Sequence, residues 1–306
     1  MTLRSATSAP RSNGNTLAES LTELWRYREL LLILVQRDLK ARYKNSALGF
    51  IWSLVNPLVQ VLTITFAIEF MLGSDSKNYS AYVLCAMLPW LFFSTGIMDA
   101  SPSLLFYYNL IRRTYFPREL VPLSFVCANL IHFLLSTSVF LVYLLVLPLV
   151  GHLQGHPPDF PILPTAFLLP IPILGLVLLV TGISLFVSVW TLHFEDMRYI
   201  ADSLLKVMYW LVPVMYFPEM IKEKIPGPKG DLIYNLYMLN PLSGLLTAFR
   251  KLTLQPEIMP GSRVPTQPMG ATEWGFLAIA LLTSTLIVLL GLRYFNTQKW
   301  KLAERA

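Results

Sequence analysis

Six long apolar stretches decide what this chain can fold into. An α-helix rises 1.5 Å per residue, so about 20 apolar residues cross the hydrocarbon core of a bilayer. The stretches cover residues 48–72, 79–98, 120–150, 165–190, 199–217 and 274–294. Apolar and polar residues do not alternate along them, which argues against the strands of a membrane barrel. We therefore predict an all-α polytopic membrane protein with six transmembrane helices.

The composition of the chain supports this prediction. Of its 306 residues, 55% are hydrophobic and only 14% are charged, whereas about a quarter of an ordinary soluble chain is charged. A soluble fold of this size could not cover so much apolar surface in one core. The net charge of +6 raises the question of nucleic-acid binding, which the positions of the charges answer.

Basic residues are distributed unevenly between the two sides of the predicted membrane domain. If both ends face the cytoplasm, 16 of the 24 Lys and Arg residues fall on the cytoplasmic side, and the loop of residues 151–164 has none. Cytoplasmic loops of membrane proteins carry such an excess of positive charge. We therefore predict cytoplasmic termini, and we attribute the surplus charge to topology and anionic lipid rather than to nucleic acid.

The N-terminal region divides into a tail and an amphipathic segment. Residues 1–18 are rich in Ser, Thr, Asn, Pro and Gly, which is typical of disorder. Residues 19–47 place apolar side chains at helical spacing among many charges, which predicts an amphipathic helix at the cytoplasmic interface. Such a helix could serve as a plain membrane anchor, or it could also dock a cytoplasmic partner.

The loop between the second and third spans mixes aromatic residues with Arg112, Arg113 and Arg118. Aromatic and arginine side chains are enriched at protein interfaces. We predict a short helix that a partner contacts; the alternative is an interfacial turn that packs only on lipid.

The last outer loop, residues 218–272, contains an apolar stretch that is interrupted by Asn240 and Pro241. Proline breaks a helix because it lacks an amide hydrogen and clashes with the preceding turn. Each half is too short to span, so we predict two short re-entrant helices; a helical lid on the surface is the alternative.

Ionisable groups lie inside the predicted fifth span. Lys206 shares a helix face with Asp202 and Arg198, which lie four and eight residues earlier. The stripe could neutralise itself internally, or it could line a hydrated path for an anionic substrate. Aromatic residues leave a similar choice, since they belt membrane interfaces but would also stack on sugars in a channel.

Several signatures are absent from the sequence. It contains no phosphate-binding loop, dinucleotide fingerprint or cluster of metal ligands. Cys85 and Cys127 lie within predicted spans and are expected to be packing residues. We therefore expect no enzymatic activity, cofactor or metal in this chain, and uphill transport would need a partner or an ion gradient.

Residues 37–58, RDLKARYKNSALGFIWSLVNPL, resemble the signature of permease subunits of ABC-2 type exporters of O-antigen, capsule and teichoic acid. The matching residues are Arg42, Tyr43, Lys44, Ser46, Leu48, Gly49, Trp52 and Pro57. The segments VPVMYFPE (212–219) and LNPLSGLLTAFR (239–250) are also similar. His193 and Glu195–Asp196 depart from the pattern, because the family has a basic residue and a single Asp there.

The resemblance implies an ABC-2 type transmembrane domain over residues 48–295 and a cytoplasmic tail over 296–306. It also implies a second copy of the chain and two ATP-binding cassette subunits that bind ATP and magnesium. The expected substrate is a lipid-linked glycan of the undecaprenyl-diphosphate type, such as O-antigen, and the expected location is the bacterial inner membrane. The alternatives are export of a drug or small lipid, a gradient-driven carrier, and a membrane scaffold.

The resemblance and the residue pattern together predict roles for individual residues. The positions expected to dock the ATPase subunits are Glu29, Arg37, Asp38, Arg112, Arg113, Tyr115, Phe116 and Arg118. Those expected along the substrate pathway are Arg42, Trp52, Phe66, Trp90, Phe93, Lys206, Tyr209 and Tyr216. Asn240 and Pro241 are expected to form a gate hairpin.

Overall fold

The computed structural model describes residues 17–44, 79–153, 162–256 and 266–298, together with Val59, Leu62, Thr63 and Phe66. In this part of the chain the regular elements are helices, and one isolated antiparallel bridge joins Ile162 to Leu254. The prediction of an all-α chain is confirmed. Apart from those four residues, the predicted first span at 48–72 lies outside the described residues, as do nearly all of the two predicted tails.

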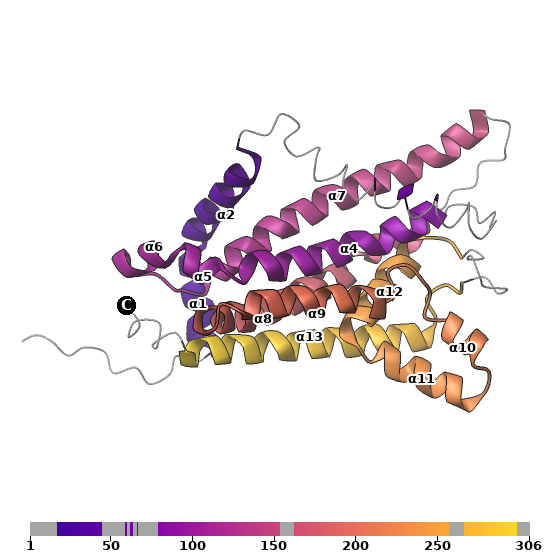
Figure 1. Ribbon diagram of the computed structural model, residues 1–306. Coiled ribbons are helices and arrows are strands. Elements are labelled where there is room, and N and C mark those ends of the chain that lie inside the picture. The colour runs from indigo at the N-terminus through magenta and orange to yellow at the C-terminus, as the bar shows by residue number, and fades with distance from the viewer. Residues whose placement is uncertain are drawn as a thin grey trace, which may run out of the picture.

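Four long helices run side by side and form the body of the molecule (Figure 1). They are α4 (Tyr79–Ala100), α7 (Leu120–Leu153), α8 (Pro170–His193) and α13 (Ala271–Gln298). A 3₁₀ turn, Pro164–Leu168, leads into α8. All four are long and apolar enough to cross a membrane. They coincide with the second, third, fourth and sixth predicted spans.

The predicted fifth span at 199–217 is wrong in its extent. Helix α9 covers Met197–Leu211, 15 residues, or about 22 Å, which is less than the thickness of a bilayer core. It stops early because Pro213 has no amide hydrogen and forces an extended backbone on the residue before it. Val212 has φ −96° and ψ 156°. The total of six spans stays a prediction.

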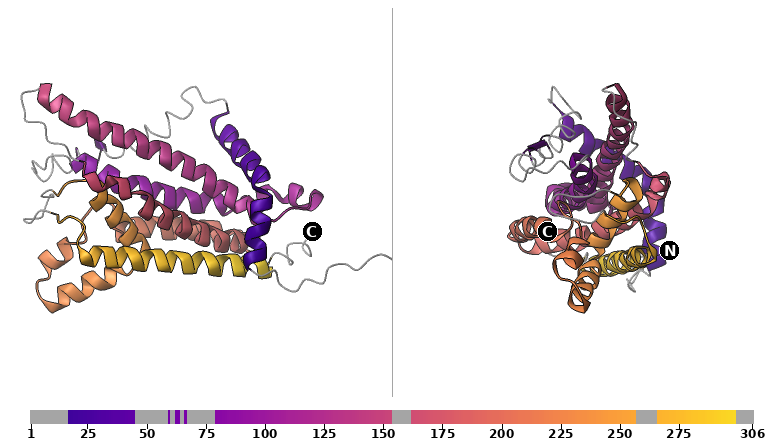
Figure 2. Two further views of the ribbon diagram at one scale, coloured as in Figure 1. Left: turned by 180° about the vertical axis from the view of Figure 1, so that it is seen from behind. Right: turned by 90° about the vertical axis from the view of Figure 1, so that its right-hand side faces the viewer.

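One end of the bundle carries four short or amphipathic helices, and we call it the α2 end. Helices α1 (Leu17–Arg26) and α2 (Arg28–Tyr43) lie across it, and α5 (Ser103–Phe106) and α6 (Tyr108–Arg113) lie beside them (Figure 2). The described part of the predicted amphipathic segment, 19–47, thus forms two consecutive helices, and its place at a membrane interface stays a prediction. The helix breaks at Tyr27, whose ψ of 19° leaves the helical region.

The opposite end, the α11 end, carries α10 (Met220–Lys224) and α11 (Pro228–Met238), with α12 (Pro241–Thr253) behind them (Figure 1). The chain breaks at Asn240–Pro241, as expected. The Asn240 side chain caps α12 by accepting a hydrogen bond from the Leu242 amide at 3.1 Å. Proline suits the first helical position, where no amide donor is needed. The re-entry of these helices into a membrane stays a prediction.

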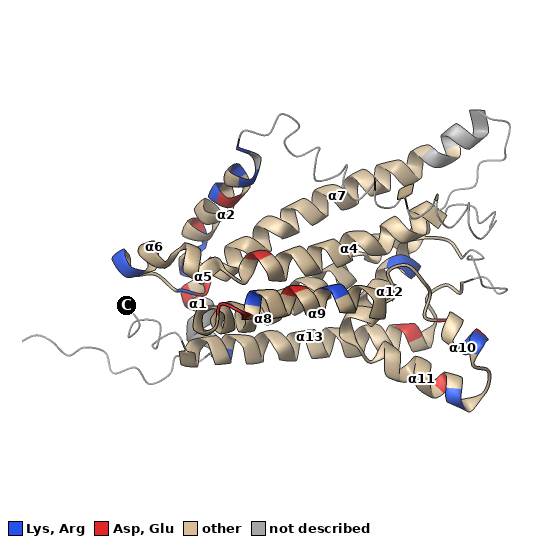
Figure 3. Ribbon diagram, viewed as in Figure 1, with Lys and Arg blue, Asp and Glu red and all other residues tan. Residues whose placement is uncertain are grey.

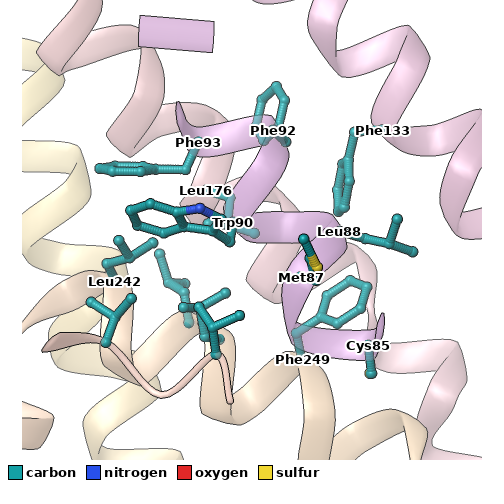
Figure 4. Packing of buried hydrophobic residues seen from close by; sticks show 14 of the residues in the cluster. Cys85, Met87, Leu88, Trp90, Phe92, Phe93, Phe133, Leu176, Leu242 and Phe249 are labelled. Atoms are coloured by element: carbon teal, nitrogen blue, oxygen red, sulfur yellow. The ribbon is translucent and has the colours of Figure 1, made fainter. Parts of the chain in front are cut away.

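Helix α12 is enclosed by the long helices. Every residue from Leu242 to Thr253 is buried, and the helix packs against α4, α8 and α13. Between them lies an aromatic core in which Phe133 stacks on Phe92 at a ring distance of 5.2 Å and contacts Phe249 at 5.9 Å (Figure 4). Cys85 is buried in the same core.

Helices α8 and α13 meet in close backbone contact at two glycines. A Cβ on Gly291 would lie 2.7 Å from the carbonyl oxygen of Gly182, and one on Gly182 would lie 2.7 Å from the amide nitrogen of Val288. Small residues allow the backbones of membrane helices to pack in direct contact. This crossing therefore tolerates no side chain.

Candidate substrate groove and partner-facing surface

A groove of about 800 Å³ lies between α4 and α9. Its lining residues are Val59, Thr63, Met87, Trp90, Leu91, Ser94, Thr95, Met98, Asp99, Asp202, Leu205, Lys206 and Tyr209. Three of the predicted pathway residues, Trp90, Lys206 and Tyr209, are thus brought together. The groove combines an apolar and aromatic wall with charged groups, which is the usual character of a ligand site.

The aromatic wall is formed by Trp90 of α4 and Tyr209 of α9, whose rings lie 5.6 Å apart. Phe93, a further predicted pathway residue, lies behind Trp90 at 5.7 Å and is only 1% exposed. Figure 4 shows Trp90 and Phe93 among the packed core residues. Phe93 therefore supports the wall from behind and does not line the groove.

Charged residues follow one another along α9 (Figure 3), and two of them, Asp202 and Lys206, line the groove. Lys206 pairs with Asp202 one turn earlier, with a distance of 2.6 Å between Nζ and Oδ2. Both side chains are exposed, at 75% and 43%. The expected pairing on one helix face is present, and it is compatible with both interpretations of the stripe. Helix α9 is amphipathic and too short to span a bilayer core, and Lys206 lies on its exposed side.

Arg42 of α2 enters a three-residue cluster at the α2 end of the groove. Its Nη2 lies 2.5 Å from Oδ2 of Asp99, and its Nη1 donates to Oδ1 of Asn129 at 3.1 Å. Asn129 in turn donates to the same Asp99 oxygen at 2.9 Å. Three helices, α2, α4 and α7, are therefore joined at one point. Sequence analysis missed Asp99 and Asn129, although an acid at the end of the second span was a visible signal.

The remaining predicted pathway residues lie elsewhere. Tyr216 lies at the α11 end, where its hydroxyl donates to the Leu211 carbonyl at 2.9 Å and contacts the Tyr237 hydroxyl at 3.0 Å. It closes the C-terminal end of α9 rather than the groove. Phe66 is 68% exposed, and Trp52 lies outside the described residues.

Two adjacent cations on α12 were not predicted as functional. Arg250 is 3% exposed and donates to the carbonyls of Pro213, Val214 and Tyr216 at 2.8–3.1 Å. Its guanidinium also lies 4.5 Å from the ring centre of Phe217. Arg250 thus satisfies carbonyl groups of the segment after α9. These carbonyls lack helical partners because the helix ends before them.

Lys251 joins the two acids that flank α12 in the fold. Its Nζ lies 2.5 Å from Glu219, just before α10, and 3.0 Å from Glu273 in the first turn of α13. The Lys251 side chain is only 4% exposed. Buried charges need such partners because desolvation of a lone ion is costly. The two cations therefore fasten the α11 end to the bundle.

The α2 end presents an exposed aromatic and basic surface on α6 and the residues after it. Arg112, Arg113 and Tyr115 are exposed, Tyr115 at 85%, and Glu29 on α2 is exposed as well. Phe116 is only 6% exposed and packs in the apolar cluster beneath α2, so its ring is not available to a partner in this conformation. Burial lowers the pKa of the half-buried Arg118.

Asp38 and Arg37, both predicted docking residues, connect α2 to the rest of the protein. The Asp38 carboxylate accepts hydrogen bonds from the Tyr107 hydroxyl at 2.5 Å and from Ser124 at 3.0 Å. Arg37 lies over the Tyr107 ring at 4.6 Å. Burial, together with the bond to Asp38, raises the pKa of Tyr107, so its hydroxyl stays a donor. Asp38 therefore holds α2 on the bundle.

Comparison with known proteins adds independent information. Residues 29–254 match the family model of the ABC-2 type transporter. The chain is 26% identical to an O-antigen export system permease protein RfbA of Klebsiella pneumoniae over 276 residues, 90% of this chain and 94% of the relative. A Myxococcus xanthus protein of the same name is 27% identical over 230 residues, 75% of this chain and 82% of the relative.

Proposed function

The chain belongs to the ABC-2 type transporter family, and from this premise we propose that it is the transmembrane subunit of an ATP-driven polysaccharide exporter. Its helices and its family indicate a multi-pass membrane protein. The proposed substrate is a lipid-linked glycan such as O-antigen, moved across the bacterial inner membrane. The observation that carries this proposal is the similarity to O-antigen export permeases over 90% of the chain.

The groove between α4 and α9 suits such a substrate. Sugar rings have apolar faces that pack on aromatic side chains, and the partly exposed ring of Tyr209, supported by the largely buried Trp90, offers such a face. Arg42 and Lys206 are the cations proposed to meet the lipid diphosphate, because phosphate oxygens accept charge-assisted hydrogen bonds. In this proposal two copies of the chain face each other across their grooves, and Asn240 and Pro241 lie in the outer gate.

Energy would come from two separate ATP-binding cassette subunits that carry ATP and magnesium. This chain is proposed to have no nucleotide site of its own and to keep both termini in the cytoplasm. The exposed surface of α6, with Arg112, Arg113 and Tyr115, would contact those subunits. Helix α2, which is hydrogen-bonded to Tyr107 next to α6, would pass their movement to the bundle.

Deletion of the gene tests the proposed function directly. We expect surface polysaccharide to disappear while lipid-linked glycan accumulates inside the cell, because synthesis continues without export. The measurement is immunoblotting of surface polysaccharide beside mass spectrometry of extracted lipid-linked glycan. A plasmid copy of the wild-type gene should restore export. Normal surface polysaccharide in the deletion strain would contradict the proposal and favour a drug exporter or a gradient-driven carrier.

Charge reversal on α6 tests the docking surface. The double variant Arg112→Glu and Arg113→Glu should lower the amount of co-purified ATPase subunit at least about tenfold, because like charges set against each other at an interface cost several kcal/mol. Quantitative blotting of the affinity-purified complex provides the measurement. Lys222→Glu with Lys224→Glu on α10, a basic pair at the other end of the bundle, is the matched control. Undiminished co-purification in the α6 variant would refute docking at this surface.

A further inference from the structure

The ion pair between Arg42 and Asp99 differs in position and exposure from other pairs in the described residues. Lys251 is buried between its two acids, with 4% of its side chain exposed against 26% for Glu219 and 13% for Glu273. Lys206 and Asp202 belong to one helix. Arg42 and Asp99 join α2 to α4, and each side chain keeps about a third of its surface exposed, 35% and 36%. A ligand can therefore reach this pair.

The Asp99 carboxylate also lines the α2 end of the groove. In this structure the Asp99 carboxylate pairs with the Arg42 guanidinium. That guanidinium is the group that the proposed function assigns to the substrate's phosphates. Asn129 orients both partners, because its amide accepts from Arg42 and donates to Asp99. The three residues form a closed set in which the acid occupies the position of an anionic ligand.

We propose that Asp99 is a built-in competitor that occupies Arg42 until the diphosphate of the lipid-linked substrate displaces it. This inference rests on the proposed function and adds a specificity-determining residue to it. A diphosphate carries more negative charge than one carboxylate and matches the two-pronged geometry of arginine. An ion pair that is about one-third exposed is weak. Exchange of the Asp99 carboxylate for a phosphate on Arg42 is therefore favourable, whereas exchange for a neutral lipid is unfavourable.

The exchange would also change which helices are connected. With Asp99 bound, Arg42 links α2 to α4; with phosphate bound to Arg42 and the Asn129 amide, the link runs from α2 to α7. Helix α4, which carries the Trp90 wall of the groove, is then released from α2. Asp38 lies one turn before Arg42 and is hydrogen-bonded to Tyr107 beside α6. A movement of α2 on substrate binding would therefore be transmitted to the proposed ATPase-facing surface.

The test uses the complete transporter with its ATPase subunits in lipid nanodiscs and farnesyl diphosphate as the probe. The variant Asp99→Asn should bind this probe about tenfold more tightly than the wild type, because the competing charge is gone. Arg42→Met should lose binding. Farnesol, which lacks phosphate, and inorganic pyrophosphate, which lacks the chain, separate lipid recognition from phosphate recognition. Asp231→Asn, which breaks an exposed pair with Lys222 at the α11 end, should bind like the wild type.

The outcomes separate the two proposals. Tighter binding cannot come from a merely damaged fold, so an increase in Asp99→Asn supports competition. Equal or weaker binding in a variant that elutes as a monodisperse complex overturns it, while probe binding by the wild type leaves the lipid-diphosphate substrate standing. If wild type, Asp99→Asn and Arg42→Met all fail to bind the probe, this inference falls; normal polysaccharide export in the deletion strain removes the proposed function as well.

Discussion

Replacement of Arg250 by methionine is expected to abolish export and to destabilise the protein by at least about 3 kcal/mol, because three buried carbonyls lose their hydrogen-bond donor at once. Methionine fills a similar volume but donates no hydrogen bond. The carbonyls of Pro213, Val214 and Tyr216 would lose the donor that they share, and each buried carbonyl without a donor costs about 1–3 kcal/mol. The segment after α9 should then detach from α12.

The measurement is the unfolding midpoint of the purified protein in detergent, beside surface polysaccharide in a complemented deletion strain. Arg293→Met is the matched control, because Arg293 is exposed on α13 and its loss should leave the midpoint within experimental error. Arg250→Lys should fall between the two, since lysine keeps the charge but cannot span three acceptors at once. A wild-type midpoint in Arg250→Met would contradict this account of the α9 end.

A valine at Gly291 is expected to prevent stable assembly of the helix bundle. Its Cβ would lie 2.7 Å from the backbone oxygen of Gly182, and a backbone atom cannot move aside as the end of a flexible side chain can. Helices α8 and α13 would have to separate along their contact. We expect a loss of at least about 1–3 kcal/mol, the usual cost of overpacking, and a large fall in the yield of folded protein in the membrane.

Gly275→Val on the same helix provides a close control. A Cβ on Gly275 meets no atom within 4 Å, and the change in helix propensity is the same in both variants. Fluorescence size-exclusion chromatography of tagged variants measures the folded fraction. If both variants give equal yields, the close crossing at Gly182 and Gly291 does not limit stability.

The long helices could be predicted because length and hydropathy are local properties of the sequence. The end of α9 was predicted too late because an apolar run continues past it, through Val212 and Val214. Pro213 was the available signal, but proline alone does not tell a kink from an end. Arg250 supplies the missing donors from 36 residues away, and no local pattern can indicate that contact.

The candidate groove was anticipated only in part. Trp90, Lys206 and Tyr209 were chosen because aromatic rings could stack on sugars and a cation in a span could meet an anionic substrate, and the fold brings them together. Phe93 belongs to the same class of residue but packs in the core behind Trp90, one turn earlier on the same helix face, and the sequence does not indicate at which of the two the groove ends. Asp99 was missed because its significance depends on Arg42, a residue 57 positions earlier in the chain.

The position of α12 bears on the order in which the protein is completed during synthesis. The helix is buried against α13, yet the ribosome makes α12 first. Lys251 can meet Glu219 as soon as it emerges, but Glu273 arrives only with the last helix. Until α13 is made, one side of α12 has no helix to pack against, and Lys251 lacks its partner Glu273. The nascent chain must therefore carry α12 and its cations with one side unpacked, and translation of α13 is the step that completes the packing of α12.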